Sequence, residues 1–520
     1  MSLSDTGEGP ASSSARLEQS PNGSLIGRSV QWVANHPLAF LVAAGFAIRA
    51  AVAIIVYVRY GGHLFPDDST YSSMAHGMAA GISGGWDPYT RTLFHETASF
   101  VWPLVVLYKM GGSSAGTLLS QLYVALLGTL TAGFTYLLAA ESLPRRWAFV
   151  AGGIVAFLPS QILWSALVLK DATAWFGLVA LALIVARAGR QENARRLAAF
   201  WVAAALLLTM MGYLREQTTV VAAWALVVSA AAGLARFRVQ RVVAAAATSL
   251  LVPLIVGIGA FGYSFVAGAR PLDVIRAQNA EGAKSALVSS TEPGSTTGHD
   301  GRSKLSELQK QILAEQSSET GSAYGSAGSS PASPVPTAAP SLSRRDARRI
   351  AQKLHVSVDE VVKQYREAVA SMGAATTATP QACSVSGSAS NDTSSLAYLP
   401  RGLSVMLLEP YPWQHESCSD SSGFMLAKGE SFLWYIVLAL CVLGLWPARH
   451  HLRSALFPLL AGGGLLLVYA LAEGNLGTAY RHRGELVWAV AFFASFGAKA
   501  LHDSWGRRRS VRGMRRVIES

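Results

Sequence analysis

Two adjacent carboxylates, Asp67 and Asp68, stand directly after the first long apolar run of the chain. Such a pair can supply a general base that takes the proton from an acceptor hydroxyl. Cationic side chains occur beside later apolar runs, where they could hold a phosphate leaving group and stabilise its developing charge. These cationic candidates are Lys170, Arg215, Arg481, His482 and Arg483, with a structural role as the alternative for the histidine. The two kinds of group together predict sugar transfer from a lipid-linked phosphosugar.

A charge at a membrane boundary also has a simple structural explanation, because it can anchor the chain at the headgroup level. A carboxylate pair alone is weak evidence as well, since adjacent aspartates are common in polar loops. A binding site is favoured because acidic and basic groups from separate apolar runs are all predicted to lie on the outer face of the membrane. A pocket for an anionic substrate is assembled in this way.

The composition indicates that lipid is the solvent for most of the chain. Of its 520 residues, 51% are hydrophobic and only 14% are charged, whereas soluble proteins carry about 25% charged residues. Apolar runs of roughly 20 residues recur, which is the length of a membrane-spanning helix. The predicted fold is therefore all-α, a polytopic membrane helical bundle that has the lipid bilayer as a partner.

The apolar runs predict about ten spans. They lie near 37–58, 115–140, 147–165, 172–188, 197–214, 218–235, 242–266, 431–447, 454–472 and 485–502. The Lys and Arg residues behind the net charge of +12 are concentrated between these runs and in the C-terminal tail. Positive loops mark the cytoplasmic side, so we expect both termini in the cytoplasm and the protein in the plasma membrane. The same distribution argues against nucleic acid as a partner.

One apolar stretch, Phe100–Met110, decides the orientation of everything after it. Counting it as a span would place the basic connections 187–196 and 236–241 outside. The stretch is short and Pro103 interrupts it, so we interpret it as an interfacial or re-entrant helix in the first external loop, at about 59–114.

The predicted spans divide the chain into five parts. In chain order they are a disordered cytoplasmic tail at 1–34, a membrane module with the catalytic first external loop at 35–266, a large external loop at 267–430, further spans at 431–502 and a basic cytoplasmic tail at 503–520. The large external loop is predicted to be partly disordered, because its low-complexity stretch at 285–343 has few apolar side chains to bury. Apolar residues at helical spacing predict short helices at 344–372. These superficially resemble a DNA-binding helix-turn-helix, but in an external loop we expect a cap over the site or a docking element.

Three segments of the sequence resemble one family. They are the Asp67-Asp68 pair with Tyr71 and Ala75, the segment 159–171 ending in Lys170-Asp171, and the segment 475–483 ending in Arg481-His482-Arg483. Together they look like the GT-C superfamily of polyprenyl-phosphate-sugar-dependent membrane glycosyltransferases, including bacterial members of actinobacterial and polysaccharide-cluster type. The resemblance covers about 37–266 and 400–502, and the region between is not matched.

The resemblance implies an activity and a site. Family members hold the catalytic carboxylate in the first external loop, which implies Asp67, with Asp68 next to it as the second candidate. They usually invert the anomeric centre by direct displacement. The donor would be a polyprenyl-phosphate-linked sugar, and the acceptor a cell-envelope glycan, a glycolipid or a protein. The five cationic side chains above would bind the donor phosphate, a role that follows from charge and topology more than from a family motif. Further substrate contacts would be Tyr71, Asp171, Glu216, Tyr411 and Trp413.

Tyr411 and Trp413 belong to the segment Leu-Glu-Pro-Tyr-Pro-Trp at 408–413, which also looks like a recurring element of polysaccharide-related members. Prolines on both sides of Tyr411 favour an extended chain. The aromatic rings could stack on a sugar face or lie at the headgroup level, and the sequence leaves both open.

Two further sites have weaker signals. His95 and Glu96 could bind a divalent cation together with Asp67, and no organic cofactor is expected. Cys383 and Cys418 both lie in the large external loop, where oxidising conditions would permit a disulfide; two unrelated thiols are the alternative.

Two rival functions share part of this pattern. A polysaccharide polymerase or ligase with a polyprenyl-diphosphate-linked donor would have similar Arg clusters, but it would need no Asp base of this kind. A transporter or flippase for lipid-linked glycans would need ionisable groups midway along its spans, whereas the charged residues here cluster at span ends.

Overall fold

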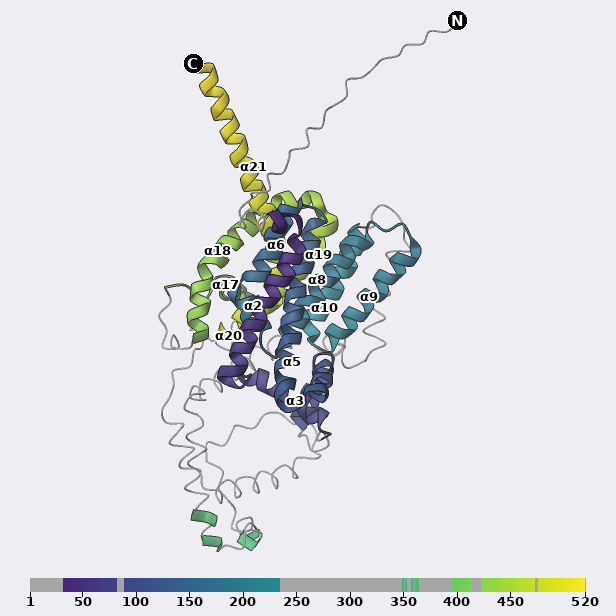
Figure 1. The fold of residues 1–520 in the computed structure, drawn as a ribbon, viewed down its shortest axis with the longest axis vertical. Helices are drawn as coiled ribbons and strands as arrows, with labels where there is room; N and C mark the ends of the chain where they lie inside the picture. Colours follow the sequence, from purple (N-terminus) through teal and green to yellow (C-terminus); the bar gives the residue numbers. More distant parts are fainter. Residues whose placement is uncertain are drawn as a thin grey trace, which may run out of the picture. The chain divides into compact units, whose positions relative to one another are not determined.

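The computed structural model describes residues 31–81, 88–233, 395–413, 422–472 and 476–519, with a few residues between 348 and 363 (Figure 1). All regular elements among them are helices, which confirms the all-α class for this part of the chain. Five helices here are long and apolar enough to cross a membrane, or six if a bent pair at 145–165 is one span. The protein is therefore a helical membrane protein, but the count of ten spans is not confirmed. The predicted span at 242–266 lies outside the described residues.

The chain forms two compact units, which are described separately. Unit 1 comprises Met1–Phe261, Ile436–Gly462 and Val487–Ser520, whereas unit 2 comprises Gly262–Tyr435 and Gly463–Leu486. The predicted carboxylate pair belongs to unit 1, as do Lys170 and Arg215. The predicted phosphate contacts at 481–483 belong to unit 2.

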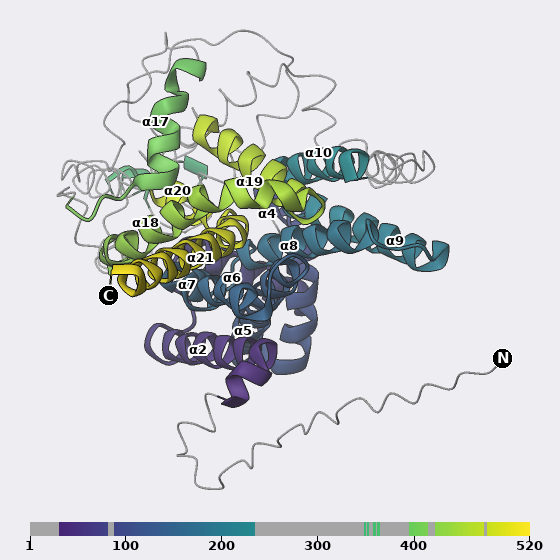
Figure 2. The ribbon, with the colours of Figure 1, turned by 90° about the horizontal axis from the view of Figure 1, so that it is seen from above.

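Unit 1 is built around α5 (Ala98–Ala140), much of whose surface is buried. Its long neighbours along the chain are α2 (Pro37–Tyr60), α6 (Arg145–Phe157), α8 (Asp171–Ala188), α9 (Ala194–Gly212) and α10 (Glu216–Gly233). The helices α2, α6 and α8 pack directly on α5, and α8, α9 and α10 contact one another (Figure 2). All of them are apolar around most of their circumference, as expected for helices whose outer surface meets lipid.

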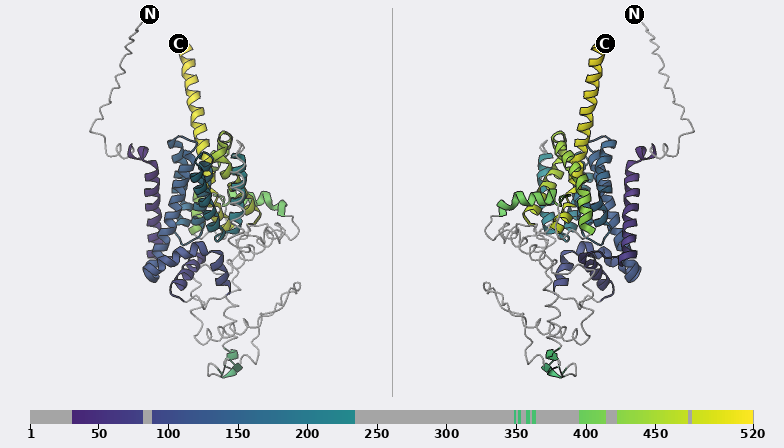
Figure 3. Two further views of the ribbon diagram at one scale, coloured as in Figure 1. Left: turned by 90° about the vertical axis from the view of Figure 1, so that its right-hand side faces the viewer. Right: turned by 90° about the vertical axis from the view of Figure 1, so that its left-hand side faces the viewer.

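Two short helices lie at the end of unit 1 where α2 finishes: α3 (Pro66–Ala79) and α4 (Pro88–Glu96) (Figure 3). Both pack on α5. The predicted separate helix at Phe100–Met110 corresponds to the first part of α5, which is interrupted at Gly112 by a positive φ of 68°. Glycine adopts this conformation without a Cβ clash. An interfacial position for this first part stays a prediction.

The predicted span at 147–165 is a bent pair of helices. It consists of α6 and a short helix α7 (Pro159–Ser165), which are bent by 55° relative to each other. The break is at Leu158, whose extended conformation has a ψ of 126°. The physical reason is Pro159, because proline disfavours helical backbone in the preceding residue and has no N–H for the helix ladder.

The helix α21 runs without interruption over Val487–Glu519, so it includes both the predicted last span and most of the basic tail. The boundary between span and tail stays a prediction. An ion pair one helical turn apart, Lys499 with Asp503 at 2.6 Å, lies where the boundary was expected. Such pairs support a helix where it leaves the apolar environment.

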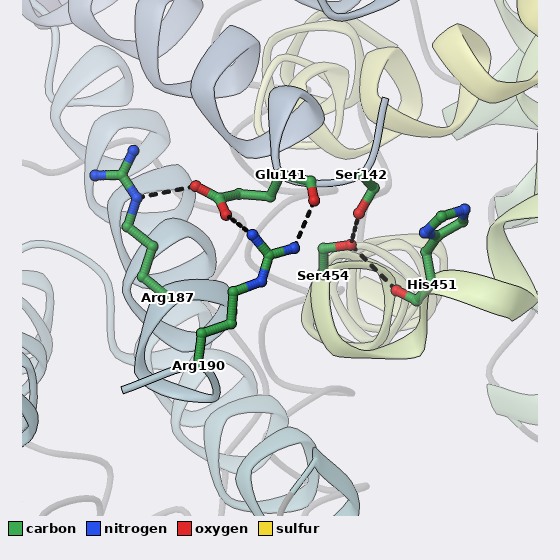
Figure 4. A network of polar contacts seen from close by, with 6 residues as sticks. All are labelled: Glu141, Ser142, Arg187, Arg190, His451 and Ser454. Carbon is green, nitrogen blue, oxygen red and sulfur yellow. Dashed lines mark hydrogen bonds and ion pairs between the residues drawn. The ribbon is translucent and has the colours of Figure 1, made fainter. Parts of the chain in front are cut away.

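Basic connections lie at the opposite end of unit 1 from α3 (Figure 1), and polar contacts join them (Figure 4). Glu141 follows α5 and accepts hydrogen bonds from Arg187 at 3.0 Å and Arg190 at 2.6 Å. The hydroxyl groups of Ser142 and Ser454 are in hydrogen-bond contact. The connections after α5 and α8 therefore meet the start of α19 (Leu452–Ala472). All three were predicted to lie on the cytoplasmic side.

Unit 2 includes α17 (Ser395–Leu408), α20 (Leu476–Arg483) and the start of α18 (Ser422–Ala448). α17 packs against α20 and lies within the predicted external loop at 267–430. Most of that loop lies outside the described residues, as do residues 1–30 of the predicted N-terminal tail. Isolated helical residues are described between 348 and 363, inside the stretch predicted to form short helices.

Close backbone packing in unit 1 yields a stability prediction. A Cβ atom added to Gly444 of α18 would overlap the carbonyl oxygen of Phe493 in α21. Overpacking of this kind costs about 1–3 kcal/mol, so Gly444→Ala should lower the thermal unfolding midpoint in detergent. Gly153→Ala is the matched control, because a Cβ atom at Gly153 in α6 meets open space. Equal unfolding midpoints for the two variants would contradict the close packing of α18 on α21.

Candidate functional site

The carboxylate pair lies in the first turn of α3, directly after Pro66. Carboxylates are favourable there because the N-terminal end of a helix carries partial positive charge. The structure gives the two side chains different environments. Asp68 is fully buried, whereas Asp67 is exposed. The exposed carboxylate is therefore the one that a substrate can reach.

Asp68 is held by the turn that precedes α3. Its Oδ2 atom accepts a hydrogen bond of 2.8 Å from the backbone N–H of Leu64. Its Oδ1 atom lies 3.5 Å from the Nδ1 atom of His63. These contacts fix the turn between α2 and α3, so Asp68 positions the helix that carries Asp67. His63 was not among the predicted site residues, because its contact depends on the turn at Gly61, where φ is 65°.

A buried ion pair joins two other predicted residues. Asp171, the first residue of α8, accepts a hydrogen bond from Arg215 in the turn between α9 and α10. Asp171 is fully buried, and Arg215 is only 8% exposed. The pairing balances two charges that would be costly to bury separately. Lys170 precedes Asp171 and is half-buried.

Three contacts connect these charges with α3. The Tyr71 ring packs edge-on against Phe100 of α5, with centroids 5.3 Å apart. The neighbouring Ser99 hydroxyl lies 2.8 Å from the carbonyl oxygen of Tyr213, two residues before Arg215. Phe65, just before α3, contacts the Trp164 ring of α7 at 5.0 Å. The carboxylate pair, Lys170, Asp171 and Arg215 therefore lie at the same end of unit 1.

Four predicted residues near this end have less defined roles. Tyr71 is buried and packs on α5. Glu216 is the first residue of α10. His95 and Glu96, near the end of α4, are exposed. The described residues contain no group of three or more His, Cys, Asp or Glu side chains that could hold a metal ion. The cation site with Asp67 stays a prediction.

In unit 2, the Arg483 side chain is buried in the protein interior. Its guanidinium stacks on the rings of Trp434 at 4.9 Å and Tyr480 at 4.5 Å. It also donates a hydrogen bond of 3.3 Å to the carbonyl oxygen of Glu409 and lies 3.8 Å from the Glu430 carboxylate. Burial lowers the pKa of Arg483, whereas Tyr480 and Glu430 raise it. These contacts give Arg483 a structural role in the packing of unit 2.

Arg481 and His482, which precede Arg483 in α20, are less buried than Arg483. The His482 ring stacks on Tyr469 at 4.5 Å, and the Tyr469 hydroxyl donates a hydrogen bond of 2.8 Å to Glu485. These contacts favour the structural alternative for His482. Arg481 is half-buried. Among the predicted phosphate contacts in unit 2, Arg481 is the best candidate, because Arg483 is buried and the His482 ring stacks on Tyr469.

The aromatic residues of the 408–413 segment form a stacked pair. The rings of Tyr411 and Trp413 lie 5.5 Å apart with planes inclined by 17°, and Trp413 is 68% exposed. Ser431 of α18 donates a hydrogen bond of 2.8 Å to the carbonyl oxygen of Pro410 and so holds the segment. Cys383 and Cys418, the predicted disulfide pair, lie outside the described residues.

No family model matches the sequence, and no curated protein matches it. Among solved structures, the chain is similar to the archaeal oligosaccharyltransferase AglB from Archaeoglobus fulgidus, determined in complex with an inhibitory peptide and a dolichol-phosphate. The TM-score is 0.43 at 13% sequence identity, over 93% of this chain and 52% of that one. The chain thus spans about half the length of that protein.

The buried ion pair gives a prediction that does not depend on any activity. Replacing Asp171 by Asn leaves the Arg215 charge buried without an opposite charge from α8, and breaking a buried pair costs about 3–5 kcal/mol. We therefore expect Asp171→Asn to lower the thermal unfolding midpoint in detergent, measured by tryptophan fluorescence. Asp503→Asn is the control, because it breaks the exposed pair with Lys499, and such pairs contribute little to stability. An unchanged midpoint for Asp171→Asn would refute the structural importance of the pair.

Proposed function

We propose that the protein is an inverting membrane glycosyltransferase of the GT-C type. It would transfer one sugar from a polyprenyl-phosphate donor to a cell-envelope glycan, a glycolipid or a protein on the outer face of the plasma membrane. One observation carries the proposal. Asp67 is exposed at the start of α3, at the same end of unit 1 as Lys170 and Arg215, while its neighbour Asp68 is buried. This arrangement supplies one accessible base at the same end of the unit as cationic groups.

In the proposed reaction, Asp67 acts as the general base. It takes the proton from the acceptor hydroxyl as that oxygen attacks the anomeric carbon of the donor sugar. The bond between the anomeric carbon and the phosphate oxygen breaks, and the polyprenyl phosphate leaves with the electron pair. Attack opposite the leaving group inverts the anomeric centre, so no covalent sugar–enzyme intermediate forms.

Cationic side chains stabilise the leaving phosphate, whose negative charge grows as the bond breaks. Lys170 and Arg215 are the candidates in unit 1. The ion pair with Asp171 orients the Arg215 guanidinium, whose fork-shaped set of N–H groups can donate further hydrogen bonds to a phosphate. In unit 2, Arg481 is proposed to contact the donor phosphate, and the Tyr411–Trp413 pair is proposed to contact a sugar face.

One observation bears on the transporter alternative. Arg49 lies midway along α2, and ionisable residues in such positions often mark transport pathways. Its side chain is fully buried, however, and donates hydrogen bonds to Ser165 and to backbone carbonyl groups. These partners give it a structural environment, so it does not favour a transporter.

The decisive assay measures transfer from a panel of synthetic polyprenyl-phosphate sugars in membranes that contain the wild-type protein or a variant. General base catalysis contributes about 10²- to 10⁴-fold, so Asp67→Asn should lower kcat by a factor in that range. Asp68→Asn should retain more activity but unfold at a lower temperature, because it changes the contacts with Leu64 and His63. An arm with a metal chelator tests the divalent cation separately.

Glu192→Gln is the matched control for the loss of one exposed carboxylate, since Glu192 lies in the connection at the opposite end of unit 1. Its activity should equal that of the wild type. Full activity of both Asp67→Asn and Asp68→Asn would instead favour the polymerase or ligase that uses a diphosphate-linked donor. Absence of transfer from every donor, combined with uptake of a lipid-linked glycan, would favour the transporter.

A further inference from the structure

A buried arginine lies in the middle of an apolar helix. Arg49 is the thirteenth residue of α2 (Pro37–Tyr60), and its side chain has no exposed surface. A guanidinium carries five N–H donors, each of which needs a partner in an environment without water. The sugar-transfer mechanism does not use this residue.

The Arg49 donors bind the broken helix pair α6–α7. Its Nη1 and Nη2 atoms donate hydrogen bonds of 2.8 and 2.9 Å to the carbonyl oxygens of Ala156 and Val155. Its Nε atom donates a hydrogen bond of 2.8 Å to the Ser165 hydroxyl. A further bond of 3.1 Å reaches the carbonyl oxygen of Gly45 in α2 itself. One side chain therefore contacts the last turn of α6 and the last residue of α7.

The two α6 carbonyls need such a donor because of the break. In a continuous helix the carbonyl of Val155 would accept the N–H of residue 159, but Pro159 has no N–H. The carbonyl of Ala156 would accept the N–H of Ser160, but the bend of 55° turns α7 away from the α6 axis. Arg49 replaces both helix bonds with side-chain bonds.

The other end of the contact is equally specific. The Ser165 hydroxyl accepts the Arg49 bond and donates its own hydrogen to the carbonyl oxygen of Gln161. Gly128 of α5 faces this group, and a Cβ atom there would overlap Ser165. Ser165 ends α7, five residues before Lys170. Its position therefore sets where the chain enters the turn that carries Lys170 and Asp171.

We propose that Arg49 is a positioning residue that holds the α6–α7 break and, through Ser165, places Lys170 at the donor phosphate. The catalytic part of this inference rests on the proposed function. The structural part does not, because it concerns only how residues 158–170 are held. The two parts can therefore be tested by separate measurements on the full chain.

The structural measurement is backbone hydrogen–deuterium exchange of the full-length protein in detergent. Arg49→Met should raise exchange in peptides covering 158–170 by about tenfold, as expected when local opening becomes easier, with no change in α9. Arg59→Met is the matched control, since Arg59 is an exposed arginine at the end of the same helix. Unchanged exchange at 158–170 in Arg49→Met, or an equal rise in α9, would overturn the proposal.

Ser165→Ala provides a second variant should Arg49→Met fail to fold, because it removes one hydroxyl and keeps the arginine. It should raise exchange at 163–170 in the same way. In the transfer assay, Ser165→Ala should lower kcat in the wild-type background but have little further effect in Lys170→Ala, since both changes act through Lys170. Independent, multiplicative losses would overturn the positioning role. Inactivity of the wild type would remove the proposed function and leave the exchange result as the test of the structural part, the hold of Arg49 on the α6–α7 break.

Discussion

The fold of unit 1 depends on one constraint: a polar group buried among apolar helices must find its partner within the protein. The break before Pro159 creates two carbonyl groups that no longer have helix partners, and the guanidinium of Arg49 fills both positions. A charged side chain in the middle of α2 and a proline-induced bend in α6–α7 are each unfavourable alone. Together they satisfy each other, and the bent pair can then turn the chain toward the end of the unit where α3 lies.

The same constraint sorts the charges at that end. Asp171 and Arg215 are buried and neutralise each other, and Asp68 is buried against a backbone N–H and His63. Asp67 differs because its position on the first turn of α3 points it out of the packed core. Successive residues on a helix are rotated by about 100°, and at the first turn of α3 this rotation places Asp68 in the core and Asp67 at the surface. One carboxylate is buried as a structural partner, and the other is exposed for chemistry.

The apolar runs predicted most helices of unit 1 because length and hydrophobicity determine a span; α2 and α8 begin within a residue of the predicted positions. The break at Leu158 was missed although Pro159 signals it, because the sequence stays apolar on both sides. Neither the Arg49 contacts nor the His63–Asp68 contact could be predicted, because they join residues whose proximity follows only from packing and turn geometry. The sequence also cannot separate Asp67 from Asp68, since burial depends on how α3 docks on α5.

Arg483 illustrates the limit of reading charges as binding groups. Its position in an Arg-His-Arg cluster at a predicted span end suggested a phosphate contact, yet its guanidinium stacks between two aromatic rings and reaches Glu430. Arginine suits this environment because its planar, weakly hydrated group can stack on rings and bond at its edge. The aromatic neighbours, Trp434 and Tyr480, come from helices α18 and α20, so Arg483 ties the elements of unit 2 together. Within such a cluster, exposure decides the role, which leaves Arg481 as the member suited to bind a ligand.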